Sequence, residues 1–390
     1  MSLRVAFVTD VVYPFVRGGA QKRVHEIGRR LAARGHDVTV YGGHYWDGPP
    51  EHTHAGMTLR AVGPGRDLYA GDRRSVREAL GFAWDVLPAL RRRTGDHDVV
   101  DVSVFPYFPV LSARAATLAP STPLVATWHE VWLDYWASYL GVAGLGGRLV
   151  ERAVARVPQH PVAVSETTAD RLARIGPPRE SIAVVPNGVD VDRFRTATPD
   201  PDAPDVLFVG RLIPEKRVDR LLDAFDRVAA DADARLGVVG DGPAADPLRE
   251  RAAGMAHGDR VTFYGTYEGD LARLLAGARV YASASSREGF GITLVEAMAA
   301  GCSVVVADHP MSAARSVVGE GGFVVDPTVE ALSEGLARAL AGARPAADPV
   351  AVARRYDWGR VTDRAEAVYA RATDRRAPET VTDREGEDAA

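Results

Sequence analysis

Apolar residues recur along the chain in short runs that alternate with amphipathic stretches. The first run, Leu3–Asp10, is rich in β-branched residues, which is typical of a strand buried in a parallel sheet. A glycine-containing loop follows, and apolar residues then recur at helical spacing from Ala20 to Leu31, before Gly35. Residues 36–42 predict the next strand. This order predicts a βαβ unit that opens a doubly wound sheet.

The same alternation continues and then starts again in the second half, after a linker at Thr196–Pro204 that is rich in Pro and Asp. Further strands are predicted at 97–103, 123–129, 160–165, 181–187, 205–210, 234–243, 260–266, 278–285 and 302–308. The pattern therefore predicts an α/β protein with two Rossmann-like, doubly wound parallel-sheet domains that face a cleft, at residues 1–196 and 204–355. A last amphipathic helix is expected within residues 356–373, and the polar segment 374–390 is predicted to be a disordered tail.

Composition narrows the class of protein. The chain has 390 residues, of which 46% are hydrophobic and 25% are charged, as expected for a globular protein with two large cores. A net charge of −5 gives no support to a nucleic-acid partner. The single cysteine, Cys302, cannot form an internal disulfide and is expected to be buried and inert. Without a signal-peptide pattern or a membrane-spanning run, the chain is expected to be cytoplasmic.

The segment Ser286–Gly301, SREGFGITLVEAMAAG, carries the most informative chemistry. Glu288 and Glu296 are separated by seven residues that include two glycines. Thr293 and Glu296 fit a capping box, in which Thr293 would cap a helix and Glu296 would reach back to it. That interpretation would explain Glu296 without a ligand, but it leaves Glu288 unexplained, because Glu288 precedes the expected helix.

Positive charges and glycines follow the first strand of each predicted domain, where strand ends face the cleft. Arg211 and Lys216 lie in the loop of the second domain, and Lys22 and Lys216 are the only lysines of the sequence. Gly18 and Gly19 occupy the matching loop of the first domain, where backbone N–H groups at a helix start could bind an oxygen anion. A tight turn would use the two glycines equally well. The dinucleotide fingerprint G-x-G-x-x-G is absent, which argues against a dehydrogenase.

Aromatic residues distinguish the first domain. Trp128, Trp132 and Trp136 are spaced by four, with Tyr135 and Tyr139 close to the same stripe, and they predict a helical face that packs on the core. The alternative is an aromatic platform, with Trp132 and Trp136, for an acceptor. The segment Trp84–Arg93 adds a basic cluster to apolar residues, so it is either a solvated helix end or a contact with anionic lipid.

Six segments, in the expected order, resemble the retaining nucleotide-sugar glycosyltransferases of the GT-B fold that are marked by E-x7-E, family 4 or "glycosyl transferases group 1". The segments are GGAQKRVHEIGRRLAARGHDVTV, ATWHE, VVPNGVDVDRF, GRLIPEKRVD, SREGFGITLVEAMAAG and the helix after YDW. The resemblance extends to about residue 373. It implies an acceptor-side first domain, a nucleotide-sugar-binding second domain, and a last helix that crosses back to the first domain.

The resemblance also implies roles for single residues. Arg211 and Lys216 would contact the donor diphosphate, Glu288 the hydroxyls of the donor sugar, and Glu296 the ribose. Backbone N–H groups near the start of the following helix would face the sugar and diphosphate, as would those of the first domain's glycine pair; these residues are Gly291, Ile292, Thr293, Leu294, Gly18 and Gly19. His129 would lie near the reacting carbon and orient a substrate, and Asn187 would shape the cleft-facing loop.

The implied activity is transfer of a hexosyl group, with retention, from a donor such as UDP- or GDP-hexose to a glycan, lipid-linked or small-molecule acceptor. In this family the departing phosphate is described as taking the acceptor's proton. Asp190 and Asp192 resemble a metal-binding D-x-D but follow an Asn-Gly turn, so no metal and no cofactor are predicted. A sugar-nucleotide epimerase, a phosphorylase-like enzyme and a non-catalytic nucleotide-sugar-binding protein remain alternatives, as does peripheral contact with the inner face of the membrane.

Overall fold

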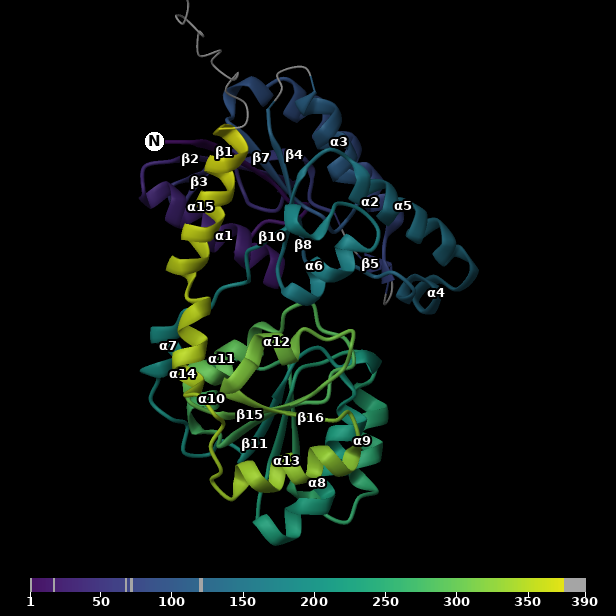
Figure 1. Ribbon diagram of the computed structural model, residues 1–390, viewed down its shortest axis with the longest axis vertical. Helices are drawn as coiled ribbons and strands as arrows, with labels where there is room; N and C mark the ends of the chain where they lie inside the picture. The colour runs from purple at the N-terminus through teal and green to yellow at the C-terminus, as the bar shows by residue number, and fades with distance from the viewer. Residues whose placement is uncertain (1, 17, 67–68, 71–72, 119–121, 375–390) are drawn as a thin grey trace, which may run out of the picture.

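The computed structural model describes residues 2–16, 18–66, 69–70, 73–118 and 122–374. These residues form two α/β domains, which lie one above the other in Figure 1. The tail predicted at 374–390 lies outside the described residues, apart from Asp374, at which the last helix ends.

The first domain contains an eight-stranded sheet with the order β10-β9-β8-β7-β1-β2-β4-β3. Neighbouring strands are parallel except for β3, which pairs antiparallel with β4 and which the sequence pattern did not predict. The strands are β1 (Arg4–Val8), β2 (Asp37–His44), β3 (Glu51–His54), β4 (Met57–Pro64), β7 (Val99–Ser103), β8 (Leu124–Trp128), β9 (His160–Ala163) and β10 (Ala183–Val184). A separate short pair is formed by β5 (Tyr69–Ala70) and β6 (Arg73–Arg74).

The second domain contains six parallel strands in the order β13-β12-β11-β14-β15-β16. They are β11 (Val206–Val209), β12 (Leu236–Val239), β13 (Val261–Gly265), β14 (Val280–Ser283), β15 (Ser303–Ala307) and β16 (Gly322–Val325). The strand order reverses between β11 and β14, and in the first sheet it reverses between β1 and β7. Ligands of doubly wound sheets bind beyond the carboxyl ends of the strands at such reversals. The predicted fold class of two doubly wound, parallel-sheet domains is confirmed.

Helices cover both faces of each sheet, which is why most of the strands are almost entirely apolar. The helices are α1 (Gly19–Ala33), α2 (Val76–Arg91), α3 (Phe108–Thr117), α4 (Tyr135–Leu140), α5 (Gly144–Arg156), α6 (Glu166–Ala173), α7 (Val191–Arg195), α8 (Val218–Ala232), α9 (Ala245–Ala253), α10 (Leu271–Gly277), α11 (Ile292–Ala300), α12 (Ala314–Val318), α13 (Val329–Leu340), α14 (Pro349–Ala353) and α15 (Trp358–Asp374). In the first domain α1 and α15 share a core with one sheet face, whereas α2, α3, α5 and α6 share a core with the other.

The last helix, α15, runs from the level of the second domain up along the first domain (Figure 1, yellow). Arg34 at the end of α1 forms ion pairs with Asp363 at 2.7 Å and Glu366 at 2.6 Å. The hydroxyl of Tyr369 donates a hydrogen bond of 2.6 Å to the buried carboxylate of Asp101 on β7. The C-terminal end of the described chain is therefore part of the first domain's core.

Candidate active site

The loop between β11 and α8 brings two cations to the cleft. β11 ends at Val209, the short 3-10 turn Pro214–Lys216 follows, and Arg217 adopts a left-handed backbone before α8 begins. The ammonium of Lys216 forms an ion pair with the carboxylate of Glu288, and both side chains are largely buried. Arg211 is exposed at the cleft. The site therefore places a cation and a carboxylate in direct contact at the carboxyl ends of the strands.

Glu288 is held in place through its own backbone. Its N–H donates to the carbonyl of Met311 at 3.3 Å, and its carbonyl accepts from the N–H of Ala313 at 2.8 Å. Gly291 has φ +84°, a conformation that favours glycine, and it caps α11, which begins at Ile292. Ile292 and Thr293 therefore form the helix start that faces the cleft, where the helix dipole favours an anion.

The predicted capping box is wrong. The N-cap residue of α11 is Gly291, no side chain caps the helix, and Thr293 lies inside the first turn. The hydroxyl of Thr293 instead accepts a hydrogen bond of 3.0 Å from Tyr281. The N–H of Leu294 donates to the carbonyl of Gly291 at 3.0 Å, and the Leu294 side chain is buried in the core. Glu296 is consequently not explained by helix capping.

Glu296 is instead a buried carboxylate whose residue is 6% exposed. Its Oε1 lies 3.8 Å from the Nζ of Lys22, which comes from α1 of the first domain. Burial raises the pKa of Glu296, and the positive charges of Lys22 and Arg193 oppose that rise. Each of the two lysines of the sequence thus pairs with one glutamate of the E-x7-E segment, a pairing that no local pattern predicts.

The two walls of the cleft approach each other closely at the start of α1. Gly18 is the N-cap of α1, with extended backbone, and Gly19 is its first residue. A Cβ atom built on Gly19 would lie 2.9 Å from the Cδ1 of Ile292 in the second domain. Because real Cβ contacts are longer, a side chain at position 19 would push the domains apart or displace Ile292. The glycine keeps the two helix starts adjacent.

His129 follows β8 and carries a polar atom that the protein leaves unpaired. Its Nε2 is buried and has no hydrogen-bond partner among the described residues. Burial and the positive charge of Arg23 lower the pKa of His129 to about 3, so the ring is neutral at physiological pH. Asn187, which is buried and lines the same cavity as His129, accepts a hydrogen bond of 3.3 Å from Arg23.

Most of the predicted site residues line one cavity of about 590 Å³. The predicted residues that line it are Gly19, His129, Asn187, Arg211, Lys216, Glu288, Gly291, Ile292, Thr293 and Trp132. Gly18, Leu294 and Glu296 lie behind this lining. Gln21, Phe105 and Glu130, which sequence reasoning did not select, also line the cavity.

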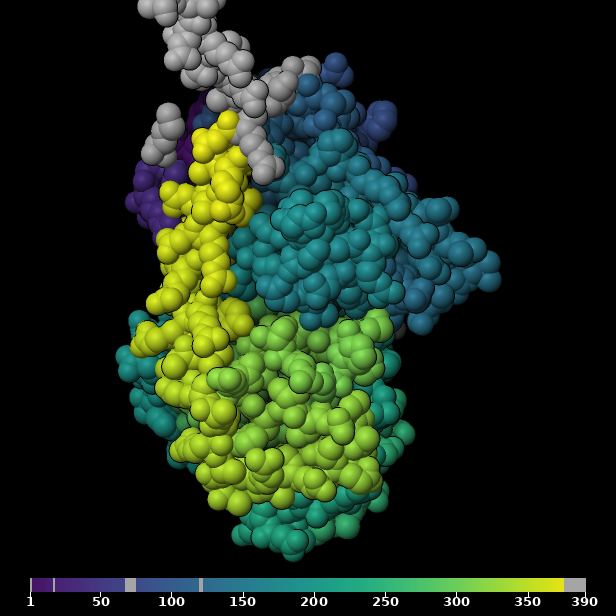
Figure 2. Space-filling view, viewed as in Figure 1, coloured from purple at the N-terminus to yellow at the C-terminus, as the bar shows by residue number. Residues whose placement is uncertain are grey.

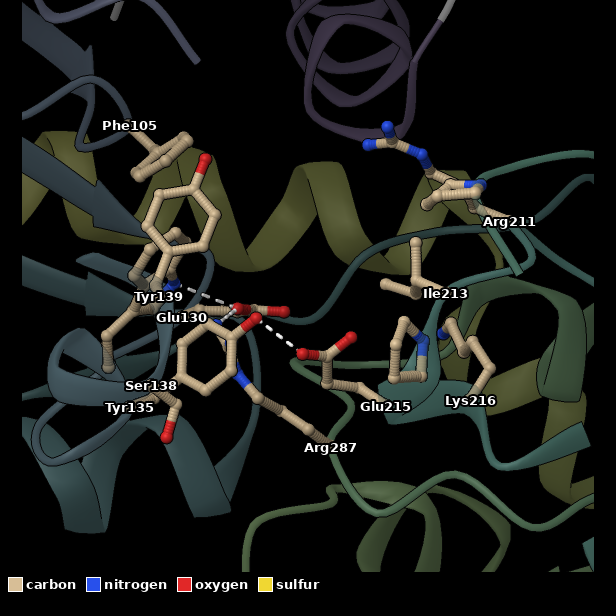
Figure 3. A pocket seen from close by; sticks show the side chains of 13 residues that line it. Phe105, Glu130, Tyr135, Ser138, Tyr139, Arg211, Ile213, Glu215, Lys216 and Arg287 are labelled. Atoms are coloured by element: carbon tan, nitrogen blue, oxygen red, sulfur yellow. Dashed lines mark hydrogen bonds and ion pairs between the residues drawn. The ribbon is translucent and has the colours of Figure 1, made fainter. Parts of the chain in front are cut away.

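The three tryptophans are buried in the core of the first domain, so their predicted core packing is confirmed. The predicted helical stripe is wrong, because Trp128 lies on β8, Trp132 in a loop and Trp136 on α4. Trp132 also lines the cavity described above and a neighbouring cavity of about 410 Å³, shown in Figure 3. Trp136 lines neither of these two cavities and packs against Trp132 with ring centroids 4.7 Å apart.

The described part of the chain contains no group of three or more His, Cys, Asp or Glu residues that could hold a metal ion. The side chain of Asp190 accepts a hydrogen bond from the N–H of Arg193 and so caps α7, and Asp192 lies 3.5 Å from Arg195. Cys302 is buried, and burial raises the pKa of its thiol to about 12. Among the described residues, no helix has the length and apolar character needed to cross a bilayer.

Two doubly wound domains line one cavity, to which both contribute glycines and carboxylates and the second contributes two cations, and this arrangement fits a nucleotide-sugar glycosyltransferase of the GT-B class. Residues 17–193 match "Glycosyltransferase Family 4", and residues 190–355 match "Glycosyl transferases group 1". The fold resembles that of sucrose-phosphate synthase from Thermosynechococcus elongatus, with a TM-score of 0.76 and 18% identity over 96% of this chain and 100% of that one.

Curated relatives agree with this class. The chain is 33% identical over 380 residues to a phosphatidyl-myo-inositol mannosyltransferase of Mycobacterium tuberculosis, covering 91% of this chain and 93% of the relative. It is 30% identical over 368 residues to a GDP-mannose-dependent α-(1-6)-phosphatidylinositol monomannoside mannosyltransferase of the same species, covering 86% and 89%. The chain belongs to glycosyltransferase family 4, and it is a retaining glycosyltransferase. The predicted family and activity are confirmed.

Proposed function

We propose that this protein transfers mannose from GDP-mannose to a phosphatidylinositol-type lipid. Both mycobacterial relatives are named as mannosyltransferases of a phosphatidylinositol lipid, one of them is named as GDP-mannose-dependent, and both align with 86% or more of the chain. The proposal specifies the donor sugar, the base and the acceptor, which the family alone leaves open.

The observation that carries the proposed chemistry is the direct contact of Lys216 with Glu288 in a cavity that also contains Arg211. We assign Lys216 and Arg211 to the donor diphosphate, where negative charge grows as the glycosidic bond breaks. Glu288 accepts hydrogen bonds from the hydroxyls of the donor sugar. The Lys216–Glu288 ion pair holds both side chains in place before the donor binds. When the donor binds, Lys216 contacts the diphosphate and Glu288 contacts the sugar hydroxyls in place of each other.

Other residues in and beside the cavity complete the donor site. Glu296, whose pKa is raised by burial against the opposing positive charges of Lys22 and Arg193, accepts from the ribose hydroxyls. The backbone N–H groups of Ile292 and of the Gly18–Gly19 pair contact the diphosphate at two helix starts. His129 is neutral, and its Nε2 forms a hydrogen bond with the reacting sugar. The departing phosphate takes the acceptor's proton. In this proposal neither a metal ion nor a protein nucleophile is required.

A lipid acceptor also fits one face of the first domain. Trp84 on α2 is 78% exposed and Val142, between α4 and α5, is 90% exposed. Further exposed large apolar residues lie on the same layer of helices, which α2, α3 and α5 form on the right of the upper domain in Figure 1; they are Val76, Leu80, Leu111, Leu118, Leu145 and Leu149. We name these eight residues the apolar face. Arg91, Arg92 and Arg93 are exposed at the end of α2. Apolar side chains beside arginines suit an anionic membrane surface.

The donor and acceptor are tested with radiolabelled nucleotide sugars. GDP-mannose should transfer its label into the lipid fraction when phosphatidylinositol is supplied in mixed micelles, and the product should be the α-anomer, because the family is retaining. UDP-glucose and UDP-N-acetylglucosamine serve as competing donors. Transfer from a UDP-sugar but not from GDP-mannose would contradict the proposed donor. Labelling of a soluble glycan but not of the lipid would contradict the proposed acceptor.

Membrane contact is tested by sedimentation with vesicles rich in phosphatidylglycerol. The variant Leu80→Ser/Trp84→Ser should bind at least about 30-fold more weakly than the wild type, because each residue loses buried apolar area worth about 1 kcal/mol or more. A matched control, Arg227→Ser/Arg249→Ser, removes two exposed side chains of the second domain and should bind normally. Equal binding by all three proteins would rule out the apolar face as the contact.

A further inference from the structure

The second cavity, of about 410 Å³, lies beside the donor cavity and has a different chemistry (Figure 3). One wall comes from α4 and the loop before it, and the other comes from the loop between β11 and α8. Trp132, Phe105 and Lys216 are among the residues that line both cavities. A molecule in the second cavity would therefore lie next to the donor without occupying the donor's place.

The wall contributed by the first domain is aromatic. Tyr135 and Tyr139 lie one turn apart on α4, with ring centroids 6.1 Å apart, and Trp132 meets Tyr139 edge-on at 4.8 Å. In Figure 3 the ring of Tyr139 lies above that of Tyr135 at one edge of the cavity. Aromatic faces bind the C–H faces of saturated rings, so this wall can hold a sugar-like ring.

The opposite wall supplies a carboxylate. Glu215, on the turn before α8, accepts a hydrogen bond of 2.5 Å from the hydroxyl of Tyr135. A carboxylate has about four acceptor positions, so Glu215 can accept further hydrogen bonds from ligand hydroxyls. The same contact raises the pKa of Tyr135, beside the larger effect of burial, so the phenol remains a donor at physiological pH.

Arg287, the cation that lines this cavity but not the donor cavity, is already paired. Arg287 forms an ion pair with Glu130 and lies over the ring of Tyr135, with its guanidinium carbon 3.8 Å from the centroid. Glu130 also accepts from the indole N–H of Trp132 at 3.1 Å. These contacts fix Arg287 against the aromatic wall. What the cavity offers a ligand is therefore aromatic surface and carboxylate oxygens, a combination that suits a neutral polyol ring better than an anion.

We propose that this second cavity is the acceptor site and that it binds the polyol ring, a cyclitol or a pyranose, whose hydroxyl receives the sugar. The ring would stack on Tyr135 and Tyr139, Glu215 would accept from its hydroxyls, and the attacking hydroxyl would point toward the wall shared with the donor cavity. This inference rests on the proposed function for the existence of an acceptor, but it does not depend on which nucleotide sugar is the donor.

Ser138 allows a direct test, because it lines the cavity, is exposed, and precedes Tyr139 on α4. Ser138→Trp should fill the cavity without disturbing the core. Ala137→Trp is the matched control, since Ala137 is exposed on the same helix but does not line the cavity. Saturation-transfer NMR with free myo-inositol and with methyl α-mannoside, each with and without GDP, measures binding of the ring itself.

The wild type and Ala137→Trp should give saturation transfer to at least one of the two rings, and Ser138→Trp should lose at least nine-tenths of that signal. GDP binding, measured by calorimetry, should be equal in all three proteins. Equal ring binding in Ser138→Trp, or no ring binding by the wild type, would overturn the acceptor cavity. Failure of GDP or GDP-mannose to bind the wild type would contradict the proposed donor. The ring-binding measurement would still test the acceptor cavity in that case.

Discussion

Replacing Glu288 with glutamine is expected to reduce sugar transfer on the order of 10³-fold while the protein keeps its fold. The carboxylate contacts Lys216 directly, and we assign it two hydrogen bonds to the donor sugar. Hydrogen bonds to a charged group contribute about 1.5–3 kcal/mol each, so losing the charge accounts for a change of this size. Glutamine preserves the size of the side chain, and the backbone hydrogen bonds of residue 288 do not depend on its charge.

The measurement is kcat/KM for transfer, together with the thermal unfolding temperature. The control is Glu334→Gln, which changes an exposed glutamate on α13 of the same domain and should leave both values unchanged. A Glu288→Gln protein that transfers sugar within about threefold of the wild-type rate would remove Glu288 from the site.

Replacing Lys216 with alanine is expected to lower kcat/KM by about 10²- to 10³-fold, with kcat reduced as well as donor affinity. A fixed cation beside the leaving diphosphate stabilises charge that is larger in the transition state than in the bound donor, so its loss slows the chemical step. Removal of Lys216 also leaves the Glu288 carboxylate without its cation, and that charge then opposes the approach of the diphosphate.

Steady-state kinetics over a range of donor concentrations separate the two parameters. Arg227→Ala, on α8 of the same domain, is the control, because its exposed guanidinium pairs with Glu330 away from the cavity. Addition of a chelator should leave the wild-type rate unchanged. A change in KM alone would mean that Lys216 binds donor and transition state equally, and loss of activity with chelator that Mg²⁺ restores would assign the leaving-group charge to a metal ion instead.

The E-x7-E segment shows which features of the site a local sequence pattern predicts and which it does not. Its residue types and spacing led to the correct family, and eight of the predicted donor-site and catalytic residues, together with Asn187 and Trp132, line one cavity. The capping box failed for a local reason. Gly291 adopts a left-handed backbone and is the N-cap, so α11 begins at Ile292, one residue before Thr293, and a four-residue pattern does not reveal that conformation.

The aromatic segment failed for a different reason. Spacing by four predicts one helical face only if a helix spans all the residues, but β8 ends at Trp128 and α4 begins at Tyr135. Of the second cavity, the sequence selected Trp132, Arg211 and Lys216, and it placed Tyr135 and Tyr139 close to the tryptophan stripe, but it missed Glu215 and Arg287. Arg287 had a visible signal, its position beside Glu288 in the E-x7-E segment, whereas no local pattern indicated that Glu215 meets Tyr135 of the first domain.

The sequence by itself determined the two parallel sheets, the family and the loops that carry the charges, since strand periodicity, turn glycines and motif spacing are properties of neighbouring residues. The tertiary structure decided which charges meet. Lys22 reaches Glu296 across 274 positions of the chain because α1 and α11 begin on opposite walls of the cleft, and Tyr135 reaches Glu215 in the same way. Such pairs depend on how two separately folded domains pack, and a linear pattern of apolar and polar positions does not encode that packing in any local form.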